Sequence, residues 1–554
     1  VISNDLSRQI NRNSLKVYDR VLSIDAVAKN GSTSPYGTIV AQSESPLDPD
    51  FIAIGTDDGL IQVTENAGES WRKIDNIDGA PNQSYVNSVY LSQHDINVMY
   101  VAFNHHKYGD FKPYIFRSDD RGNTWKSISN NLPERGSLYS IEEDHIDSNL
   151  IFCGTEFGVF FSPNLGGRWK ELSNGLPTIA VRDIAIQQRE NDLVAATFGR
   201  GFYVLDNYEP LRTVGKDILN KRAHLFSVKD ALLYVPATPL GGGGTGSQGH
   251  NMRSAKNPSF GATFSLYLDG VGSSLRSKRQ KEEKKLEKEG TAVYYPSFEE
   301  IRAEDLEGKA SLIWQIYDAS GSEVRRMKSA PKKGIQRQVW NLRTNTTDPI
   351  GSRGSGFLVT PGDYTVSISL VKDGSVELLV DKKAFKVKGL NNQTLLAENP
   401  EELKEFRAEM SELNRKVSGT EKVMGETKES IELIEKALLN YPNTDLTLLK
   451  SIREMMVSLK DLEVLMWGDK ARSSRDFETV PSISGRLGMV GYQIYQNTAG
   501  VTKTHRLNMQ IAEKQYNALR TELNEIIGKL NAIESKLEGI IPYTKNKGAD
   551  WKKD

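Results

Sequence analysis

One short segment occurs three times in the first 210 residues, and it constrains the fold more than any other feature of this sequence. Each copy has the pattern [ST]-x-[DN]-x-G-x-x-W, and the copies align without gaps at residues 64–71, 118–125 and 162–169. Their tryptophans are 54 and 44 residues apart, close to the roughly 40–50 residues of one four-stranded propeller blade. Because a strand-like stretch precedes each copy, the spacing predicts consecutive blades of a β-propeller.

The residue types in these octets suit a tight turn between the two outer strands of a blade. A hydroxyl and an Asp or Asn side chain can satisfy the backbone groups of a turn, and glycine accepts positive φ. The tryptophan then packs inward. We therefore predict a structural role for the following octet residues: Thr64, Asn66, Gly68, Trp71, Ser118, Asp120, Gly122, Trp125, Ser162, Asn164, Gly166 and Trp169.

A fourth unit, residues 181–206, has the inner strand and the hairpin of a blade but no octet. We interpret it as the last blade. A partial ring has open strand edges, and residues 1–20 look like the end of a preceding blade. We therefore expect upstream blades, in the same polypeptide or in another chain, to close the ring.

The octets are identified as Asp boxes. With YGTIVAQSESPLDP, GTDDG and ATFGRGFYVLDNYEPLR, the region most resembles bacterial sortilin-like proteins of the BNR-repeat type, often labelled "glycosyl hydrolase, BNR repeat". The resemblance continues through NPSFGATFSLYL and PGDYTVSI to the C-terminal helices, so it covers nearly the whole chain, as the C-terminal half of a longer family protein. It implies export to an extracytoplasmic location: periplasmic, cell-surface or secreted.

The single cysteine, Cys153, is a departure from part of that family. Eukaryotic sortilins follow their propeller with a cysteine-rich module, which one cysteine cannot build, so receptor-type sorting is not transferred. The sequence also begins without Met and without a basic-then-apolar leader. We expect the N-terminus to be internal to a longer protein.

The loops of a four-stranded meander alternate between two ends of the sheet, so the loops after the second strands lie opposite the octets. Four such loops would converge on one propeller mouth, where loops on a rigid scaffold usually carry function. Asp-Gly and Glu-x-Gly are also ordinary hairpin chemistry, which leaves a purely structural interpretation open. The candidate binding residues in these loops are Asp57, Asp58, His105, His106, Tyr108, Glu156, Phe198 and Arg200.

A sialidase would need an arginine cluster, a tyrosine nucleophile with a glutamate partner, and an acid/base aspartate. Arg200 supplies one arginine, and Asp57 and Asp58 supply carboxylates. Adjacent carboxylates on one turn are badly placed to flank a sugar. The catalytic residues therefore stay unknown, and hydrolysis is not supported by this portion alone.

Composition excludes several function classes. There are 71 basic and 72 acidic residues, so no net charge favours nucleic acid. One cysteine excludes a cysteine-based zinc site, no EF-hand-type calcium loop is present, and no apolar run is long enough for a membrane span. The glycines at 241–249 neither follow a buried strand nor open a helix, and they predict a flexible loop rather than a phosphate site. We expect no metal, no cofactor and no nucleic-acid partner.

The remaining sequence predicts a mainly β, then α, multidomain protein. The full division is blades at 1–212, an irregular connector with glycine-rich and charged segments at 213–305, a β-sandwich of immunoglobulin or fibronectin type at 306–390, an antiparallel helical bundle or hairpin at 396–541, and a tail at 542–554. Alternating apolar and polar residues predict the strands of the sandwich. Apolar residues at three-to-four spacing, after the capping sequence Asn399-Pro400-Glu401-Glu402, predict the helices. Residues 477–499 are predicted as a structured loop across the helices.

Three functions are compatible with this sequence. The leading one is an exported propeller protein whose mouth binds a glycan, peptide or protein. The second is a sialidase-like glycoside hydrolase whose catalytic residues lie mostly on upstream blades. The third is a secretion or assembly accessory that docks through its helical tail.

Overall fold

The computed structural model describes residues 3–14, 16–17, 19–27, 37–214, 218–236, 255–347, 354–390, 395, 397–495, 497–537 and 540. The chain forms two compact units, residues 1–227 and 228–554, each of which is described by itself. The glycine run at 241–249 and the tail at 542–554 lie outside the described residues.

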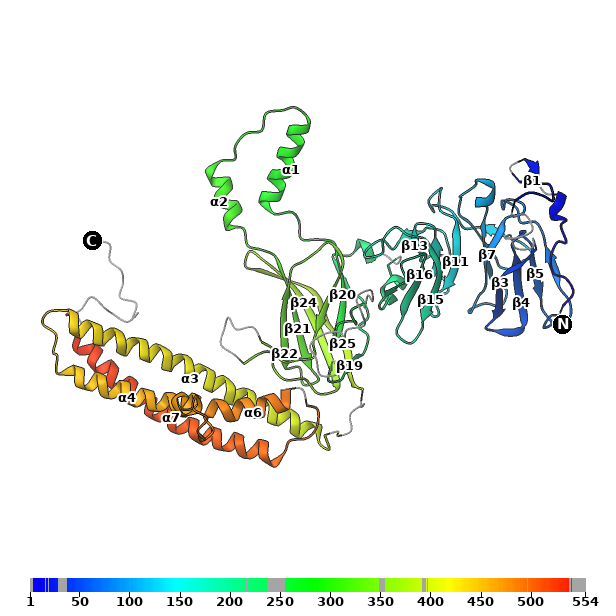
Figure 1. The fold of residues 1–554 in the computed structure, drawn as a ribbon. Helices are drawn as coiled ribbons and strands as arrows, with labels where there is room; N and C mark the ends of the chain where they lie inside the picture. The colour runs from blue at the N-terminus through cyan, green and yellow to red at the C-terminus, as the bar shows by residue number, and fades with distance from the viewer. Residues whose placement is uncertain are drawn as a thin grey trace. The chain divides into compact units, whose positions relative to one another are not determined.

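The first unit contains successive antiparallel sheets, each made of strands in chain order (Figure 1). Three sheets have four strands, and a fourth has three. We number them blades 1 to 4. Their strands are β3 (Ile39–Ser45), β4 (Asp48–Thr56), β5 (Ile61–Thr64) and β6 (Arg72–Ile74); β7 (Tyr85–Leu91), β8 (Met99–Asn104), β9 (Tyr114–Ser118) and β10 (Lys126–Ser127); β11 (Leu138–Glu143), β12 (Ile151–Thr155), β13 (Gly158–Ser162) and β14 (Lys170–Glu171); and β15 (Val181–Gln187), β16 (Asp192–Thr197) and β17 (Phe202–Leu205).

Short elements flank these blades. They are η1 (Arg12–Ser14), β1 (Lys16–Val17), β2 (Arg20–Val21), η2 (His106–Tyr108), η3 (Glu209–Arg212), η4 (Ile218–Asn220) and β18 (Ala223–Leu225).

Apolar cores fill the spaces between neighbouring blades. Phe51 of blade 1 shares a core with Phe116 of blade 2. Trp169 of blade 3 shares the next core with Tyr100 of blade 2, and the third core joins blades 3 and 4. The first strands of neighbouring blades also contact one another. Sheets stacked face to face with their first strands together are a propeller-type arrangement.

The three octets form the same turn. In the second copy, Ser118 Oγ donates to Asp120 Oδ1 (2.8 Å) and accepts from the Gly122 backbone N–H (2.7 Å). Asp120 Oδ1 also accepts from the Thr124 N–H at 2.7 Å. Octets 64–71 and 162–169 repeat these three contacts. Gly122 has φ +84°, a conformation in which glycine is favoured.

In the second unit, two sets of strands face each other. One sheet has the order β19-β25-β24-β21-β22, and β20 pairs antiparallel with β23. Phe264 of β20 stacks on Trp314 of β21 (5.9 Å between ring centroids) and meets Phe385 of β25 edge-on. The strands are β19 (Ala231–Leu233), β20 (Ala262–Leu268), β21 (Ser311–Asp318), β22 (Glu323–Ser329), β23 (Gly334–Trp340), β24 (Gly362–Lys372) and β25 (Ser375–Gly389). β19 and β20 belong to this layered region although both precede residue 306, where the sequence placed its start.

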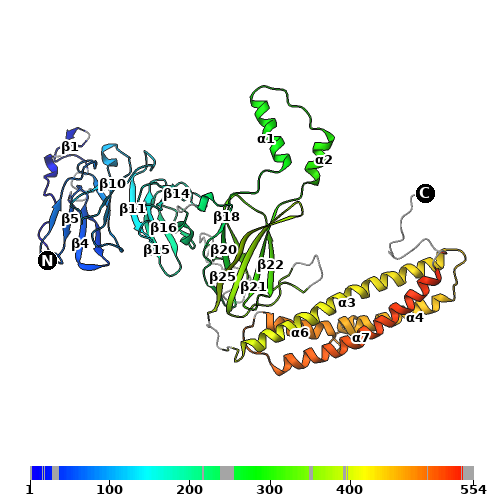
Figure 2. The same ribbon diagram turned by 180° about the vertical axis from the view of Figure 1, so that it is seen from behind.

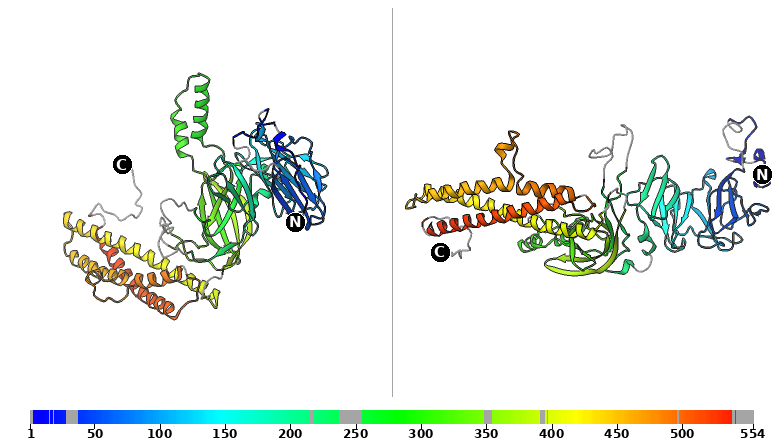
Figure 3. Two further views of the ribbon diagram at one scale, coloured as in Figure 1. Left: turned by 45° about the vertical axis from the view of Figure 1, so that its right-hand side comes forward. Right: turned by 90° about the horizontal axis from the view of Figure 1, so that it is seen from below.

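Two helices, α1 (Leu275–Lys288) and α2 (Phe298–Leu306), form a hairpin that projects from these strands (Figure 3). Arg279 of α1 pairs with Glu304 of α2 at 2.6 Å. Neither helix contains a buried residue. The charged stretch that the sequence placed in a connector is thus largely helical.

Four C-terminal helices lie side by side and share one apolar core (Figure 2). They are α3 (Pro400–Asn440), α4 (Leu448–Trp467), α6 (Ile483–Tyr495) and α7 (Lys503–Leu537), and the short helix α5 (Lys470–Ser473), which has no buried residue, follows α4. α3 begins as its sequence predicted, because Asn399 Oδ1 accepts from the N–H groups of Glu401 and Glu402.

The predicted structured loop over 477–499 is wrong for residues 483–495, which form α6. Ser482 Oγ accepts the Gly485 N–H at 3.2 Å at the start of this helix. Its buried residues Ile483, Leu487, Val490 and Ile494 recur at helical spacing. Burial of this stripe outweighs the low helix propensity of the three glycines in the segment.

Candidate functional site

Each first strand in blades 1 to 4 carries a β-bulge near its N-terminal end. The register shifts fall between Ile39/Ala41, Val86/Ser88, Leu138/Ser140 and Val181/Asp183. A bulge leaves one residue without a partner and re-aims its side chain. The four bulged residues are Val40, Asn87, Tyr139 and Arg182. They lie at the end of the blades that carries the loops after the second strands, which we call the mouth face.

Tyr139 and Arg182 form the centre of a cluster on this face. The Tyr139 hydroxyl donates to Glu156 Oε2. The Arg182 guanidinium carbon lies 3.8 Å from the centroid of the Tyr139 ring and 5.2 Å from that of Phe198. We call Tyr139, Glu156, Arg182, Phe198 and the nearby His106 the Tyr139 cluster. Blades 2, 3 and 4 all contribute to it.

The electrostatics of the cluster favour binding of an anionic group. Burial, and then the hydrogen bond to Glu156, raise the pKa of Tyr139 to about 12, so the phenol stays protonated at neutral pH. Burial and then the charge of Lys107 lower the pKa of His106, while Glu156 acts in the opposite direction. Arg182 is exposed and forms no ion pair with a carboxylate in the described part of the chain. An exposed guanidinium that lies over aromatic rings and has no carboxylate partner can bind a carboxylate or phosphate.

Exposed aromatic side chains gather on the same face. The exposed large aromatic residues in the described part of residues 1–227 share one location. Each of them lies in, or directly beside, the loop that follows the second strand of a blade. These residues, with their exposed fractions, are Tyr108 (52%), Phe111 (51%), Phe157 (43%), Phe198 (69%) and Phe202 (75%). Aromatic residues that remain exposed together are typical of interaction surfaces.

Asp57 and Asp58, two predicted binding residues, are turned into the protein. Asp57 is 7% exposed, and its Oδ1 accepts from the Gly37 and Thr38 N–H groups at 2.7 and 2.8 Å. Asp58 is fully buried and accepts from the Thr56 hydroxyl. Asp57 therefore holds the segment before β3 and Asp58 holds its own turn, and neither carboxylate is presented to a ligand.

The other predicted residues lie at the rim. His105 stacks on Tyr108 with 4.5 Å between ring centroids, and its Nδ1 lies 2.9 Å from Ser84 Oγ. Arg200 is exposed and forms no hydrogen bond, ion pair or ring contact with the described residues. Of the eight predicted residues, the structure brings His106, Glu156 and Phe198 together. Tyr139 and Arg182 were not predicted from the sequence, because a bulge that re-aims a strand residue leaves no clear signal in one sequence.

The opposite end of the blades, which we call the box face, carries a buried polar network. Asp144 is fully buried; its carboxylate accepts two hydrogen bonds of 2.8 Å from Arg212 and one of 2.6 Å from the Tyr208 hydroxyl. These contacts tie the segment after blade 4 to blade 3. Glu143 similarly accepts from Ser92 Oγ at 2.7 Å and ties blade 3 to blade 2.

Within the described ranges, no group of three or more His, Cys, Asp and Glu side chains is arranged to hold a metal ion. The same part of the chain contains no helix with the length and apolar character of a membrane span.

No protein-family model matches this chain, and no curated protein does either. Solved structures similar to it include one titled "YCF48 bound to D1 peptide" (16% identity, TM-score 0.25, 31% of this chain and 52% of that one). A second is the GH74 xyloglucanase of Xanthomonas campestris (14% identity, TM-score 0.26, 31% of this chain and 30% of that one). A third is the β-propeller domain of Cps50 (Swd1) from Myceliophteria thermophila (9% identity, TM-score 0.23, 30% of this chain and 51% of that one). The chain therefore covers about half or less of each of these three structures. At these scores the similarities carry no functional argument, and the propeller-type fold of residues 1–227 rests on its own sheets.

Proposed function

We propose that residues 1–227 form a propeller-type interaction module that binds a peptide or protein segment at the mouth face. The observation that carries this proposal is the gathering, on that face, of the exposed aromatic side chains in the described part of residues 1–227, near an arginine that contacts the Tyr139 and Phe198 rings. Aromatic residues and arginine are the residue types that dominate binding energy at protein interfaces.

The chemistry of the cluster defines the ligand. Phe157, Phe198 and Phe202 offer apolar area to an apolar or aromatic side chain. Arg182 offers a guanidinium edge to a carboxylate. The preferred ligand is therefore a segment that combines an apolar residue with an acidic group.

Selection from a random peptide display library on the full chain tests this proposal. Recovered peptides should be enriched in acidic and apolar residues, and Arg182→Ala and Phe198→Ala should each weaken their binding at least tenfold. Ile146→Ala is the matched control, because Ile146 is 62% exposed but lies after a first strand, at the box face. No enrichment, or equal loss with Ile146→Ala, would contradict the proposal, and selective binding to a glycan array would assign the same face to a sugar.

A second candidate function, glycoside hydrolysis, is favoured by the hydrogen bond between Tyr139 and Glu156. A tyrosine nucleophile with a glutamate partner is the pair that a sialidase-like enzyme requires. In this mechanism Glu156 would have to accept the proton of a phenol whose pKa is about 12. A panel of fluorogenic glycosides tests it: turnover that is lost in both Tyr139→Phe and Glu156→Gln would establish the enzyme.

Two wider assignments belong to the same proposal. The Asp-box octets and the resemblance to bacterial sortilin-like BNR-repeat proteins support membership of that family and an extracytoplasmic location. Fractionation of the source cells, with this chain detected by antibody, tests the location. The remaining hypothesis, docking through the helical tail, predicts that the full chain loses a bound partner when only the exposed residues of α3–α7 are changed.

A further inference from the structure

Two buried arginines meet at the C-terminal end of α6, where this helix contacts α3 and the loop after β23. Arg407 is 5% exposed and donates to the backbone oxygens of Leu358 (2.9 Å), Ile494 (3.2 Å) and Asn497 (2.6 Å). Arg343 is 8% exposed and donates to the backbone oxygen of Tyr495 at 2.9 Å. Both side chains therefore hold α6 in place.

The positive charge of this pair is not balanced by the residues around it. Neither arginine forms an ion pair with an acidic side chain in the described part of the chain, and Arg407 Nε has no hydrogen-bond partner there. The C-terminal end of α6 supplies the equivalent of about −0.5 charge from the helix dipole. This is less than the positive charge of the two guanidinium groups. Burial, and then the charge of Arg343, lower the pKa of Arg407 to about 10. A buried charge without a full counter-charge is costly, so an anion would stabilise this site.

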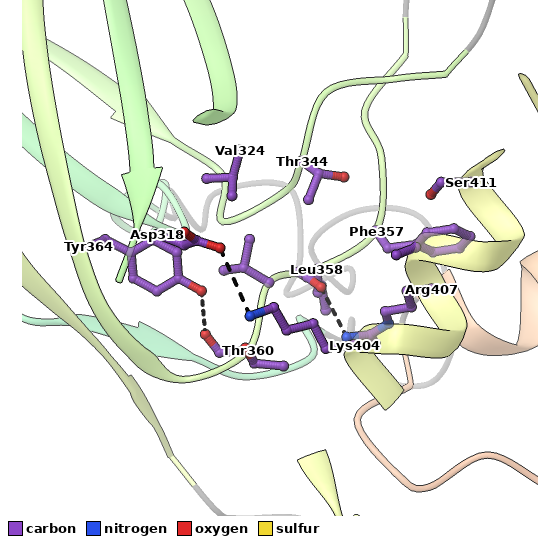
Figure 4. A pocket seen from close by; sticks show the side chains of 12 residues that line it. Asp318, Val324, Thr344, Phe357, Leu358, Thr360, Tyr364, Lys404, Arg407 and Ser411 are labelled. Atoms are coloured by element: carbon purple, nitrogen blue, oxygen red, sulfur yellow. Dashed lines mark hydrogen bonds and ion pairs between the residues drawn. The ribbon is translucent and has the colours of Figure 1, made fainter. Parts of the chain in front are cut away.

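A cavity of about 170 Å³ lies beside Arg407 (Figure 4). Its walls are mainly apolar, with Val324, Phe357 and Leu358 among the lining residues. Lys404, one turn before Arg407 on α3, adds a second cation to the lining, and Asp318 adds one carboxylate. The Lys404 Nζ lies 3.9 Å from Asp318 and 3.8 Å from Glu401, at the long end of ion pairing. A cavity of about 150 Å³ is large enough for a benzene-sized molecule.

We propose that this cavity binds a small organic carboxylate, with its apolar body against Val324, Phe357 and Leu358 and its carboxylate between Lys404 and Arg407. The lining carries two cations, Lys404 and Arg407, against one carboxylate, Asp318, and this net positive charge selects for a negative ligand. The cavity volume limits the body to roughly six to eight carbon atoms. The site is independent of the function proposed for the mouth face.

Fluorine NMR of the full chain with para-fluorobenzoate tests this proposal. We expect saturable binding, and we expect the uncharged isostere para-fluorobenzamide to bind at least tenfold more weakly. Lys404→Gln should weaken benzoate binding about tenfold because it removes one of the two cations. Lys416→Gln is the matched control on the same helix: Lys416 is also half-exposed, and it pairs only with Glu412 at the surface.

Ala408→Phe provides a second, charge-neutral test. Ala408 lines the cavity from an exposed position on α3, so a phenyl ring there should fill the cavity and leave the helix folded. Loss of benzoate binding in this variant, with an unchanged circular dichroism spectrum, supports the proposal. Absence of saturable binding, equal affinity for the benzamide, or full binding by Ala408→Phe would each overturn it.

Discussion

The two ends of the blades in residues 1–227 use polar and aromatic side chains in opposite ways. On the box face, the octet side chains bond within their own turns, and Asp144 is enclosed by Arg212 and Tyr208. On the mouth face, bulged strands turn Tyr139 and Arg182 outward among exposed aromatic rings. The difference teaches that polar residues with satisfied partners mark the scaffold, whereas exposed and incompletely satisfied ones mark the candidate binding surface.

The largest expected effect lies in the buried network of the box face. Asp144→Ala leaves the Arg212 guanidinium, whose side chain is 10% exposed, without its counter-charge. Removal of one partner from a buried ion pair costs about 3–5 kcal/mol, so urea unfolding should show a loss of this size. The pair Arg189–Glu190 is the control because its side chains are 81% and 28% exposed, and Glu190→Ala should change stability by less than about 1 kcal/mol. Equal effects in the two variants would contradict a structural role for the box face.

A second prediction concerns Glu142, on β11 between the two faces. Burial, then the charges of Asp183 and Glu143, raise its pKa to about 8. Between the unfolded pKa near 4.5 and this value, the folded state binds more protons than the unfolded state, so stability falls as the pH rises through that window. Glu142→Gln should remove this fall, a gain of about 1–3 kcal/mol at pH 8.

The measurement for Glu142 is the difference between the two stability curves from pH 4 to 9. Burial lowers the pKa of His145, so this residue makes stability rise with pH. Its contribution is the same in both proteins and cancels in the difference. If the difference between the two curves did not change with pH, the pKa of Glu142 would not be raised in the folded state, which would contradict the prediction.

The octet turn should be sensitive to loss of its hydroxyl. Ser118→Ala removes the acceptor of the Gly122 N–H and a donor to Asp120, at a cost of about 1–2 kcal/mol. Ser127, an exposed serine on β10, is the matched control and should tolerate alanine. Thermal unfolding of both variants measures the effect. An unchanged unfolding midpoint for Ser118→Ala would show that the octet turn does not stabilise the blade.

The smallest effect on stability is expected on the mouth face. Arg182→Ala loses two cation–ring contacts at an exposed site, which is worth about 1 kcal/mol or less. The same change should weaken binding of the selected peptides at least tenfold. A stability loss as large as that of Asp144→Ala would mean that Arg182 belongs to the scaffold instead.

Several features were predictable because their interactions are local. Each octet turn closes through contacts between residues two to four positions apart, and α3 is capped by Asn399 immediately before its first turn. The amino-acid sequence by itself therefore determined the blade turns, the order of the strands in residues 39–205 and the start of the long helix. Residue type and spacing suffice when a hydrogen bond spans only a few positions.

Tertiary structure alone decided which residues face a ligand. Tyr139 and Arg182 reach each other because two blades place their bulged strands side by side. Asp57, prominent in the sequence, accepts hydrogen bonds from the Gly37 and Thr38 N–H groups, 20 and 19 residues earlier, and Asp58 is fully buried. The glycine-rich segment at 483–495 becomes α6 because its apolar stripe is buried in the core of the bundle. In each case the deciding free energy comes from burial and from contacts between residues far apart in the chain, and neither is encoded in local residue order.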